Sequence, residues 1–271
     1  MVRQSALKLC DTGIVTSQLP GPTELAERLA QWATATDWVE WLELGGSLGR
    51  GAGDALSDID AGVGLTIEDV AGKLDAVQAA LTDFGPVADV LRQPFGPDTT
   101  HLIVVYRHGP QLSLVVSPAS SQPGLPPEAR ALVDKAGRLT TPIDRSRWDP
   151  ASDTRREWTF LACIAAGDAL KHAGRGRFWR AIGSLTEARD HYLKLLAADE
   201  GVVFPQFGAV SLENAGRRLP EQLAATLVSA PDASTIGAAV RALTQLLKPY
   251  VAEHDLDQLV RAIRPSLGEG G

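Results

Sequence analysis

Hydrophobic residues in the first half of the chain follow two periods, one typical of helices and one typical of strands. Behind Pro22, a residue favoured in the first turn of a helix, apolar residues recur at helical spacing over residues 23–32. The same spacing predicts a helix over Ile67–Leu81, which Thr66 is placed to cap. Short apolar runs predict strands over residues 38–44, around the segment 58–65, and over residues 86–91, 101–106 and 111–116. A mixed sheet of about five strands with flanking helices is therefore expected, and Pro127 predicts a short helix that ends at Lys135.

The second half of the chain carries helical patterns and few strand signals. The longest two are Arg155–His172, which is apolar on nearly all sides, and Phe178–Leu196. Shorter patterns follow near residues 211–219, 221–228, 234–250 and 256–263. Pro, Asp, Arg and Ser concentrate between the two halves, over residues 141–150. We therefore predict an α+β chain, with a sheet domain over residues 1–145 and a helical bundle over residues 146–271.

Composition and charge narrow the classes of protein to consider. The chain has 271 residues, 44% of them hydrophobic, which is enough for two cores, and its formal net charge is −7. This acidic balance argues against non-specific binding to nucleic acid, and no apolar run is long enough to span a membrane. The first residues do not resemble a signal peptide, and Cys10 and Cys163 make neither a disulfide framework nor a metal-ligand spacing. We expect a soluble, cytoplasmic protein without a membrane partner.

Candidate chemistry concentrates in one stretch, where the glycine-rich segment 44–51 is followed by Ser57-Asp58-Ile59-Asp60. Backbone N–H groups of a glycine turn can approach a phosphate closely. In a strand, Asp58 and Asp60 project to the same face, and two like charges held side by side favour a divalent cation between them. A glycine turn or an Asp-x-Asp pair alone is more often an ordinary turn or a solvated surface. Their combination, with the apolar run 61–65 behind it, indicates chemistry on a nucleoside triphosphate.

Charged residues also lie on the two longest helical patterns. At about 100° per residue, Glu157, Asp168 and Lys171 share one narrow sector of the first helix, either as a structural ion-pair cluster or as a stripe that faces a cleft. Arg189 lies in the middle of the apolar face of the second helix, so its guanidinium needs an acceptor. Asp168 or Glu157 could supply that acceptor, and so could a triphosphate.

Gly46-Ser47, ten intervening residues and Asp58-Ile59-Asp60 resemble the motif of the nucleotidyltransferase fold shared by DNA polymerase beta and the antibiotic nucleotidyltransferases. Arg50-Gly51 and Ser57 look most like the streptomycin- and spectinomycin-type aminoglycoside adenylyltransferases. The resemblance implies that a nucleoside monophosphate passes from ATP or another nucleoside triphosphate to a hydroxyl of a small acceptor. An aminoglycoside-like antibiotic is one such acceptor, which would make the chain an antibiotic-resistance protein.

The same resemblance implies roles for individual residues. Asp58 and Asp60 would hold two Mg²⁺ ions, while Gly46 and Ser47 would bind the β and γ phosphates with help from Arg50. Lys171 or Arg189 could also bind phosphate, and Glu157 and Asp168 could attract a cationic acceptor. These residues belong to the expected nucleotide and acceptor sites.

One position departs from the pattern of the family, which usually places a third carboxylate on a later strand. The matching position is Ser113, and a serine is neither a base near neutral pH nor a good metal ligand. Asp89 or Glu157 could replace the missing carboxylate, or the reaction could depend on positioning and metal charge alone. Alternatively, the chain has lost transfer activity and binds a nucleotide or a partner.

Overall fold

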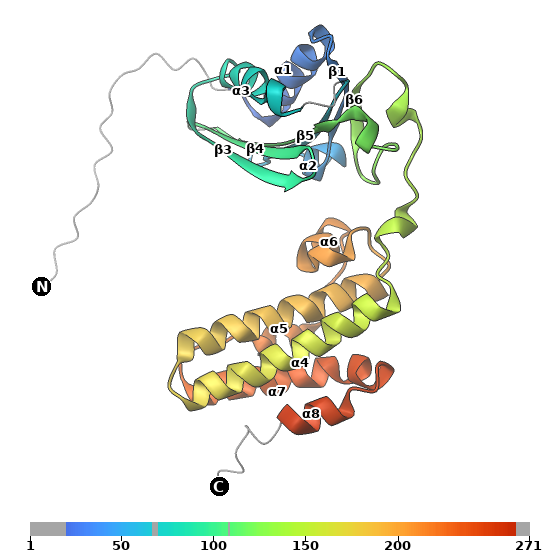
Figure 1. Ribbon diagram of the computed structural model, residues 1–271. Coiled ribbons are helices and arrows are strands. Elements are labelled where there is room, and N and C mark those ends of the chain that lie inside the picture. The colour runs from blue at the N-terminus through green and yellow to red at the C-terminus, as the bar shows by residue number, and fades with distance from the viewer. Residues whose placement is uncertain (1–19, 67–69, 108, 264–271) are drawn as a thin grey trace, which may run out of the picture. The chain divides into compact units, whose positions relative to one another are not determined.

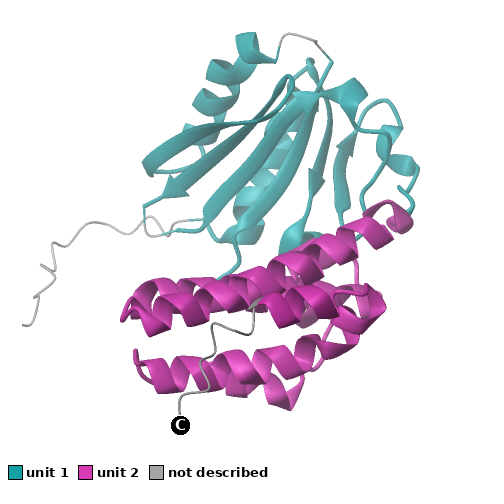
Figure 2. Ribbon diagram, turned by 60° about the horizontal axis from the view of Figure 1, so that its bottom comes forward, with its two compact units in different colours: residues 1–144 teal, residues 145–271 magenta. Residues whose placement is uncertain are grey.

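The computed structural model describes residues 20–66, 70–107 and 109–263 of the chain. By its internal contacts the chain divides into two compact units, Met1–Asp144 and Arg145–Gly271 (Figure 1). Figure 2 colours the two units separately. The division falls inside residues 141–150, the segment whose composition indicates a boundary.

The first unit is built on one mixed sheet of six strands. Its order is β3-β4-β5-β2-β1-β6, so strands distant in sequence become neighbours at the centre. β2 runs parallel to β5, and every other pair is antiparallel. The strands are β1 (Val39–Leu44), β2 (Ile59–Leu65), β3 (Val87–Gly96), β4 (Thr99–Tyr106), β5 (Gln111–Pro118) and β6 (Arg130–Asp134). This sheet, together with the helical second unit, confirms the predicted α+β fold class.

Helices cover one face of this sheet. α1 (Pro22–Ala35) and α3 (Leu74–Thr82) lie over the same side in Figure 1. Their apolar residues, such as Leu29 and Leu81, form a buried core with alternate strand residues such as Val63. Because successive strand residues point to opposite faces, the residues between these core positions lie on the other face. We call that second side of the sheet the outer face.

Two predicted helices of the first unit were wrong in part. Residues 130–134 form strand β6 instead of the helix expected over Pro127–Lys135, because the free edge of β1 offers a backbone partner that outweighs local propensity. Where a helix over Ile67–Leu81 was expected, the described part holds a 3₁₀ turn, η1 (Ala71–Lys73), followed by α3. Thr66 donates its hydroxyl to the Trp38 carbonyl at 3.4 Å, and the residues that it was expected to cap, 67–69, lie outside the described ranges.

The second unit is a helical bundle, as predicted. Its long helix α4 contacts α5, α7 and α8 and therefore lies centrally in the unit. Small residues such as Ala162, Ala166 and Ala169 line its buried side, which lets the neighbouring backbones approach closely. The helices are α4 (Ser152–Gly174), α5 (Phe178–Asp199), α6 (Ala209–Asn214), α7 (Ala233–Glu253) and α8 (Asp257–Ile263). None of the helices in the described ranges is long and apolar enough to cross a membrane.

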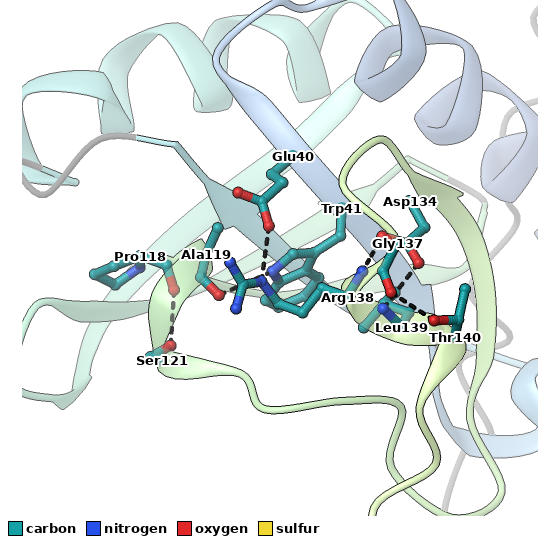
Figure 3. A network of polar contacts seen from close by, with 10 residues as sticks. All are labelled: Glu40, Trp41, Pro118, Ala119, Ser121, Asp134, Gly137, Arg138, Leu139 and Thr140. Atoms are coloured by element: carbon teal, nitrogen blue, oxygen red, sulfur yellow. Dashed lines mark hydrogen bonds and ion pairs between the residues drawn. The ribbon is translucent and has the colours of Figure 1, made fainter.

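Trp41 holds a loop against the outer face of the sheet. Its indole is 2% exposed, packs with Ala119 and Leu139, and donates its Nε1–H to the Ala119 carbonyl at 3.2 Å (Figure 3). Arg138 in the same loop donates to Glu40 at 2.7 Å. The indole can lie flat on β2 because the residue beneath it has no side chain. A Cβ atom at that residue, Gly64, would collide with Cε2 and Nε1 of the indole.

Gly64→Ala should therefore destabilise the sheet by about 2–3 kcal/mol, because Trp41 or the strand must move to admit a methyl group. Hydrogen exchange of the β1 and β2 amides measures the free energy of opening. Gly96→Ala, on β3 of the same sheet, is the matched control, since the nearest atom to its added methyl is Thr99 Cβ at 4.0 Å. That variant should change stability by no more than about 0.5 kcal/mol. Equal protection in both variants would contradict the packing described for Trp41.

Candidate functional site

A glycine turn (Gly45 and Gly46) joins the end of β1 to the short helical turn α2 (Gly46–Gly49). Gly45 donates its N–H to the Asp60 carbonyl at 2.8 Å, which ties the turn to β2. Gly46 has a φ of +56°, a conformation that favours glycine, and a Cβ there would collide with Asp60 Oδ2. The structure therefore brings the turn and the Asp60 carboxylate into direct proximity.

Asp58 and Asp60 lie where the sequence pattern predicts, on either side of a buried residue. Ile59 is 0% exposed and belongs to the core, whereas both aspartates are accessible to solvent. Asp58 Oδ1 accepts the backbone N–H of Gln111 at 2.9 Å, which fixes it beside the start of β5. The two aspartates form the carboxylate pair of the outer face.

The electrostatics of Asp60 agree with a site for a cation. Loss of solvent around its carboxylate raises the pKa of Asp60, and the negative charge of Asp58 raises it further. Arg50 and His101 act in the opposite direction. A divalent cation would relieve this repulsion, so the donor chemistry of the carboxylate pair fits Mg²⁺. Throughout the described ranges, no three His, Cys, Asp or Glu side chains gather where they could hold a metal ion together.

Ser47 and Arg50, predicted to bind nucleotide, lie beside the glycine turn. Ser47 donates its hydroxyl to Ser57 Oγ at 2.9 Å, which fastens the turn to the loop that leads into β2. Arg50 lies 3.7 Å from Glu128 and is close enough to Asp60 to lower its pKa. Positive charge therefore stands near the carboxylate pair.

A cavity of about 360 Å³ opens beside Asp58. Its walls come from the start of α1, from residues 55–58, and from Gly109 and Pro110 in the turn between β4 and β5. This volume is in the range of small-molecule sites. Sequence reasoning missed this cavity, because its walls are distant along the chain.

Ser113 lies directly beside Asp60, since the parallel register of β2 and β5 pairs these two residues. Its Oγ is 2.7 Å from His101 Nε2, within hydrogen-bonding distance. β4 pairs antiparallel with β5, which sets Ile103 opposite Ser113 and His101 opposite Val115 on the same face. Sequence reasoning missed His101, because only the strand register connects it with the Asp-x-Asp motif.

Asp89 does not join the carboxylate pair. It lies on the edge strand β3, opposite Val105, with β4 and β5 between it and β2. Three strand spacings amount to about 14 Å, too far for a shared metal ion. The hypothesis that Asp89 replaces the missing carboxylate is therefore wrong. Its local backbone pattern resembles a central strand, whereas the sheet order places it at the edge.

Arg189, Asp168 and Lys171, predicted as site residues of the second unit, have partners within that unit. Arg189 donates from Nε to Thr226 Oγ1 and from Nη2 to the Thr226 carbonyl, both at 2.9 Å. The expectation that Asp168, Glu157 or a triphosphate supplies its acceptor is corrected, because Thr226, at the end of η6 (Glu221–Thr226), accepts both hydrogen bonds. Asp168 and Lys171 form an exposed ion pair at 3.0 Å on α4. Glu157 is exposed on the same helix.

Glu43 is a second residue of the outer face that sequence reasoning missed. It lies on β1 opposite Gly62, and Gln122 Nε2 approaches its two carboxylate oxygens at 3.4 and 3.5 Å. Burial raises the pKa of Glu43 to about 7, and the contact with Gln122 offsets only part of this effect. The one local sign in the sequence that Glu43 is unusual is its place in a strand rich in apolar residues.

The raised pKa of Glu43 predicts a pH-dependent stability. Between about pH 4.5 and 7 the unfolded chain loses this proton while the folded chain keeps it, so stability should fall by up to about 3 kcal/mol as the pH rises. Urea unfolding at pH 5 and pH 8, followed by tryptophan fluorescence, measures the change. Glu43→Gln should remove this fall, whereas Glu27→Gln, at an exposed position of α1, should keep it. A fall of equal size in both variants would contradict the assignment.

Comparison with known proteins gives distant structural likenesses. No protein-family model matches the chain, and no curated protein sequence matches it. It is similar to the solved structure of an aminoglycoside 6-adenyltransferase from Bacillus subtilis, with a TM-score of 0.32, 12% identity and 92% of each chain covered. It is also similar to a nucleotidyltransferase-like protein from Exiguobacterium sibiricum, with a TM-score of 0.37 and 14% identity over 89% of this chain and 80% of that one. With TM-scores below 0.5, neither likeness supports a conclusion about activity or substrate.

Proposed function

We propose that this chain transfers a nucleoside monophosphate from a nucleoside triphosphate, such as ATP, to a hydroxyl of a small acceptor and releases pyrophosphate. The observation that carries the proposal is the contact of Asp60 with the glycine turn. The Asp60 carboxylate lies against the bare backbone of Gly46. Asp58 immediately precedes β2, and its negative charge acts on Asp60. A phosphate-binding backbone and a cation-binding pair of carboxylates are thus adjacent.

In this proposal each group has a separate task. Asp58 and Asp60 would hold Mg²⁺, which when bound offsets negative charge on the triphosphate and on the attacking and leaving oxygens. The N–H groups of the glycine turn bind phosphate oxygens, and Arg50 adds positive charge nearby. Gly46 must remain without a side chain so that Asp60 stays in place.

The acceptor would enter beside Asp58, where the cavity of about 360 Å³ lies. The sequence resemblance implies an aminoglycoside-like acceptor, and a chain with a net charge of −7 attracts such a polycation. Glu157, Asp168 and Lys171 remain candidates for contacts with the acceptor or the nucleotide.

A second candidate function is the binding of a nucleotide or a partner without transfer. The observation that favours it is Ser113, which occupies the position beside Asp60 where a third carboxylate would stand. The two candidates differ in a measurable product, since only the first releases pyrophosphate.

Asp58→Asn and Asp60→Asn should each weaken Mg²⁺-dependent ATP binding at least about 10-fold and reduce transfer at least about 100-fold, because each variant removes a negative charge that the cation needs. Calorimetry measures binding, and radiolabelled ATP incubated with a set of aminoglycosides measures transfer. Asp89→Asn is the matched control, since it removes a carboxylate about 14 Å from the pair and should change neither quantity.

The result separates the alternatives. Normal Mg²⁺–ATP binding by both variants would contradict the proposed metal site. Mg²⁺-dependent binding by the wild-type chain without pyrophosphate release for any acceptor would favour the second candidate function.

A further inference from the structure

On the outer face, Ser113 and His101 lie within hydrogen-bonding distance of each other, at the place beside Asp60 where a third carboxylate is expected. Ser113 is the register partner of Asp60 on the adjacent strand, so their backbones are about 4.8 Å apart. Its Oγ lies 2.7 Å from His101 Nε2 on β4. The two side chains are partly buried, which restricts competition from water. Ser113 on β5 therefore connects Asp60 on β2 with His101 on β4, two strands away.

Within the pair of Ser113 and His101, the imidazole interacts electrostatically with Asp60 of the carboxylate pair. His101 is close enough to Asp60 to lower its pKa. The strand neighbour of His101 on the other side is Gln93, which is uncharged, and the Phe95 ring packs edge-on against the imidazole at 5.9 Å.

We propose that Ser113 and His101 form a proton relay that takes the proton of the acceptor hydroxyl in place of a third carboxylate. The inference rests on the proposed nucleotidyl transfer. The acceptor oxygen bonds to the α-phosphorus while the bond from that phosphorus to the bridging oxygen breaks, and pyrophosphate leaves with the electron pair. The acceptor proton passes to Ser113 Oγ as the proton of Ser113 passes to His101 Nε2, which leaves an imidazolium.

The relay requires one tautomer of His101. Nε2 must be unprotonated so that the Ser113 hydroxyl can donate to it, and the ring proton then resides on Nδ1. Serine alone is too weak a base to accept the proton near neutral pH, so its function depends on the imidazole behind it.

Glu43 is the rival proton acceptor on this face. Its register places it in one row with Gly62, Val115 and His101, so Glu43 and His101 lie at opposite ends of that row. Other charged groups near the relay are Asp58, Asp60 and Arg50. Only His101 has a direct polar contact with Ser113 among the side-chain hydrogen bonds of the described residues. A test must therefore separate His101 from Glu43.

His101→Gln tests the relay, because glutamine can still hydrogen-bond Ser113 but cannot take up a proton. Rates of transfer from radiolabelled ATP would be measured from pH 5.5 to 9 with streptomycin, spectinomycin, kanamycin and water as acceptors. The wild-type rate should fall on the acidic side as the imidazole is protonated. In His101→Gln that dependence should disappear and the rate should drop about 100- to 10,000-fold, with Mg²⁺–ATP affinity within about 2-fold of wild type.

Two further variants complete the design. Ser113→Ala should lose as much activity as His101→Gln, and the double variant should be no worse than either, because both residues act in one relay. Glu43→Gln should retain the acidic fall in rate. Circular dichroism verifies that each variant is folded.

Several outcomes would overturn the relay alone. For His101→Gln, these are a wild-type rate, an unchanged pH profile or the loss of Mg²⁺–ATP binding. For the double variant, the contradicting result is a loss of activity equal to the product of the two single losses. For Glu43→Gln, it is the disappearance of the acidic fall in rate. The failure of the proposed function differs, because the wild-type chain would then transfer nothing to any of these acceptors. That result would overturn the relay together with the proposed function.

Discussion

Parallel pairing between β2 and β5 joins two segments that a long crossover separates in sequence. The crossover includes α3 and the hairpin of β3 and β4, as parallel neighbours require. Through this pairing Asp60 comes to lie beside Ser113, and β4 then carries His101 to the other side of Ser113. A register shift of one residue would send Ser113 to the core face and separate every one of these groups. The geometry of the candidate site is therefore a property of the sheet.

The local sequence pattern was sufficient to predict the positions of residues whose geometry depends on their neighbours in sequence. The alternation around Ile59 placed Asp58 and Asp60 together, and the glycines before α2 indicated the bare turn. It was not sufficient for contacts created by strand order. His101 and Glu43 have no local signal that connects them with Asp60, and the acceptor of Arg189 is Thr226, a residue far along the chain.

Failures in predicting the fold have the same origin. Residues 130–134 have a composition that suits a helix as well as a strand, and the exposed edge of β1 decided between them. The sequence around Asp89 predicts a strand but does not indicate where in the sheet that strand lies, and the sheet order puts it at the edge. In both cases the deciding interaction joins parts of the chain that sequence periodicity treats separately.

Ser113 and His101 stand where a third carboxylate is expected, and this difference changes the negative charge of the site. A carboxylate at position 113 would add a third negative charge beside Asp60, whose pKa is already raised by burial and, to a smaller extent, by the charge of Asp58. Ser113 and His101 avoid that repulsion, but they offer a cation less negative charge. A triphosphate must then contribute more of the oxygen ligands of any bound Mg²⁺, because the protein supplies two carboxylates. Cation binding and nucleotide binding at this site are therefore expected to be mutually dependent.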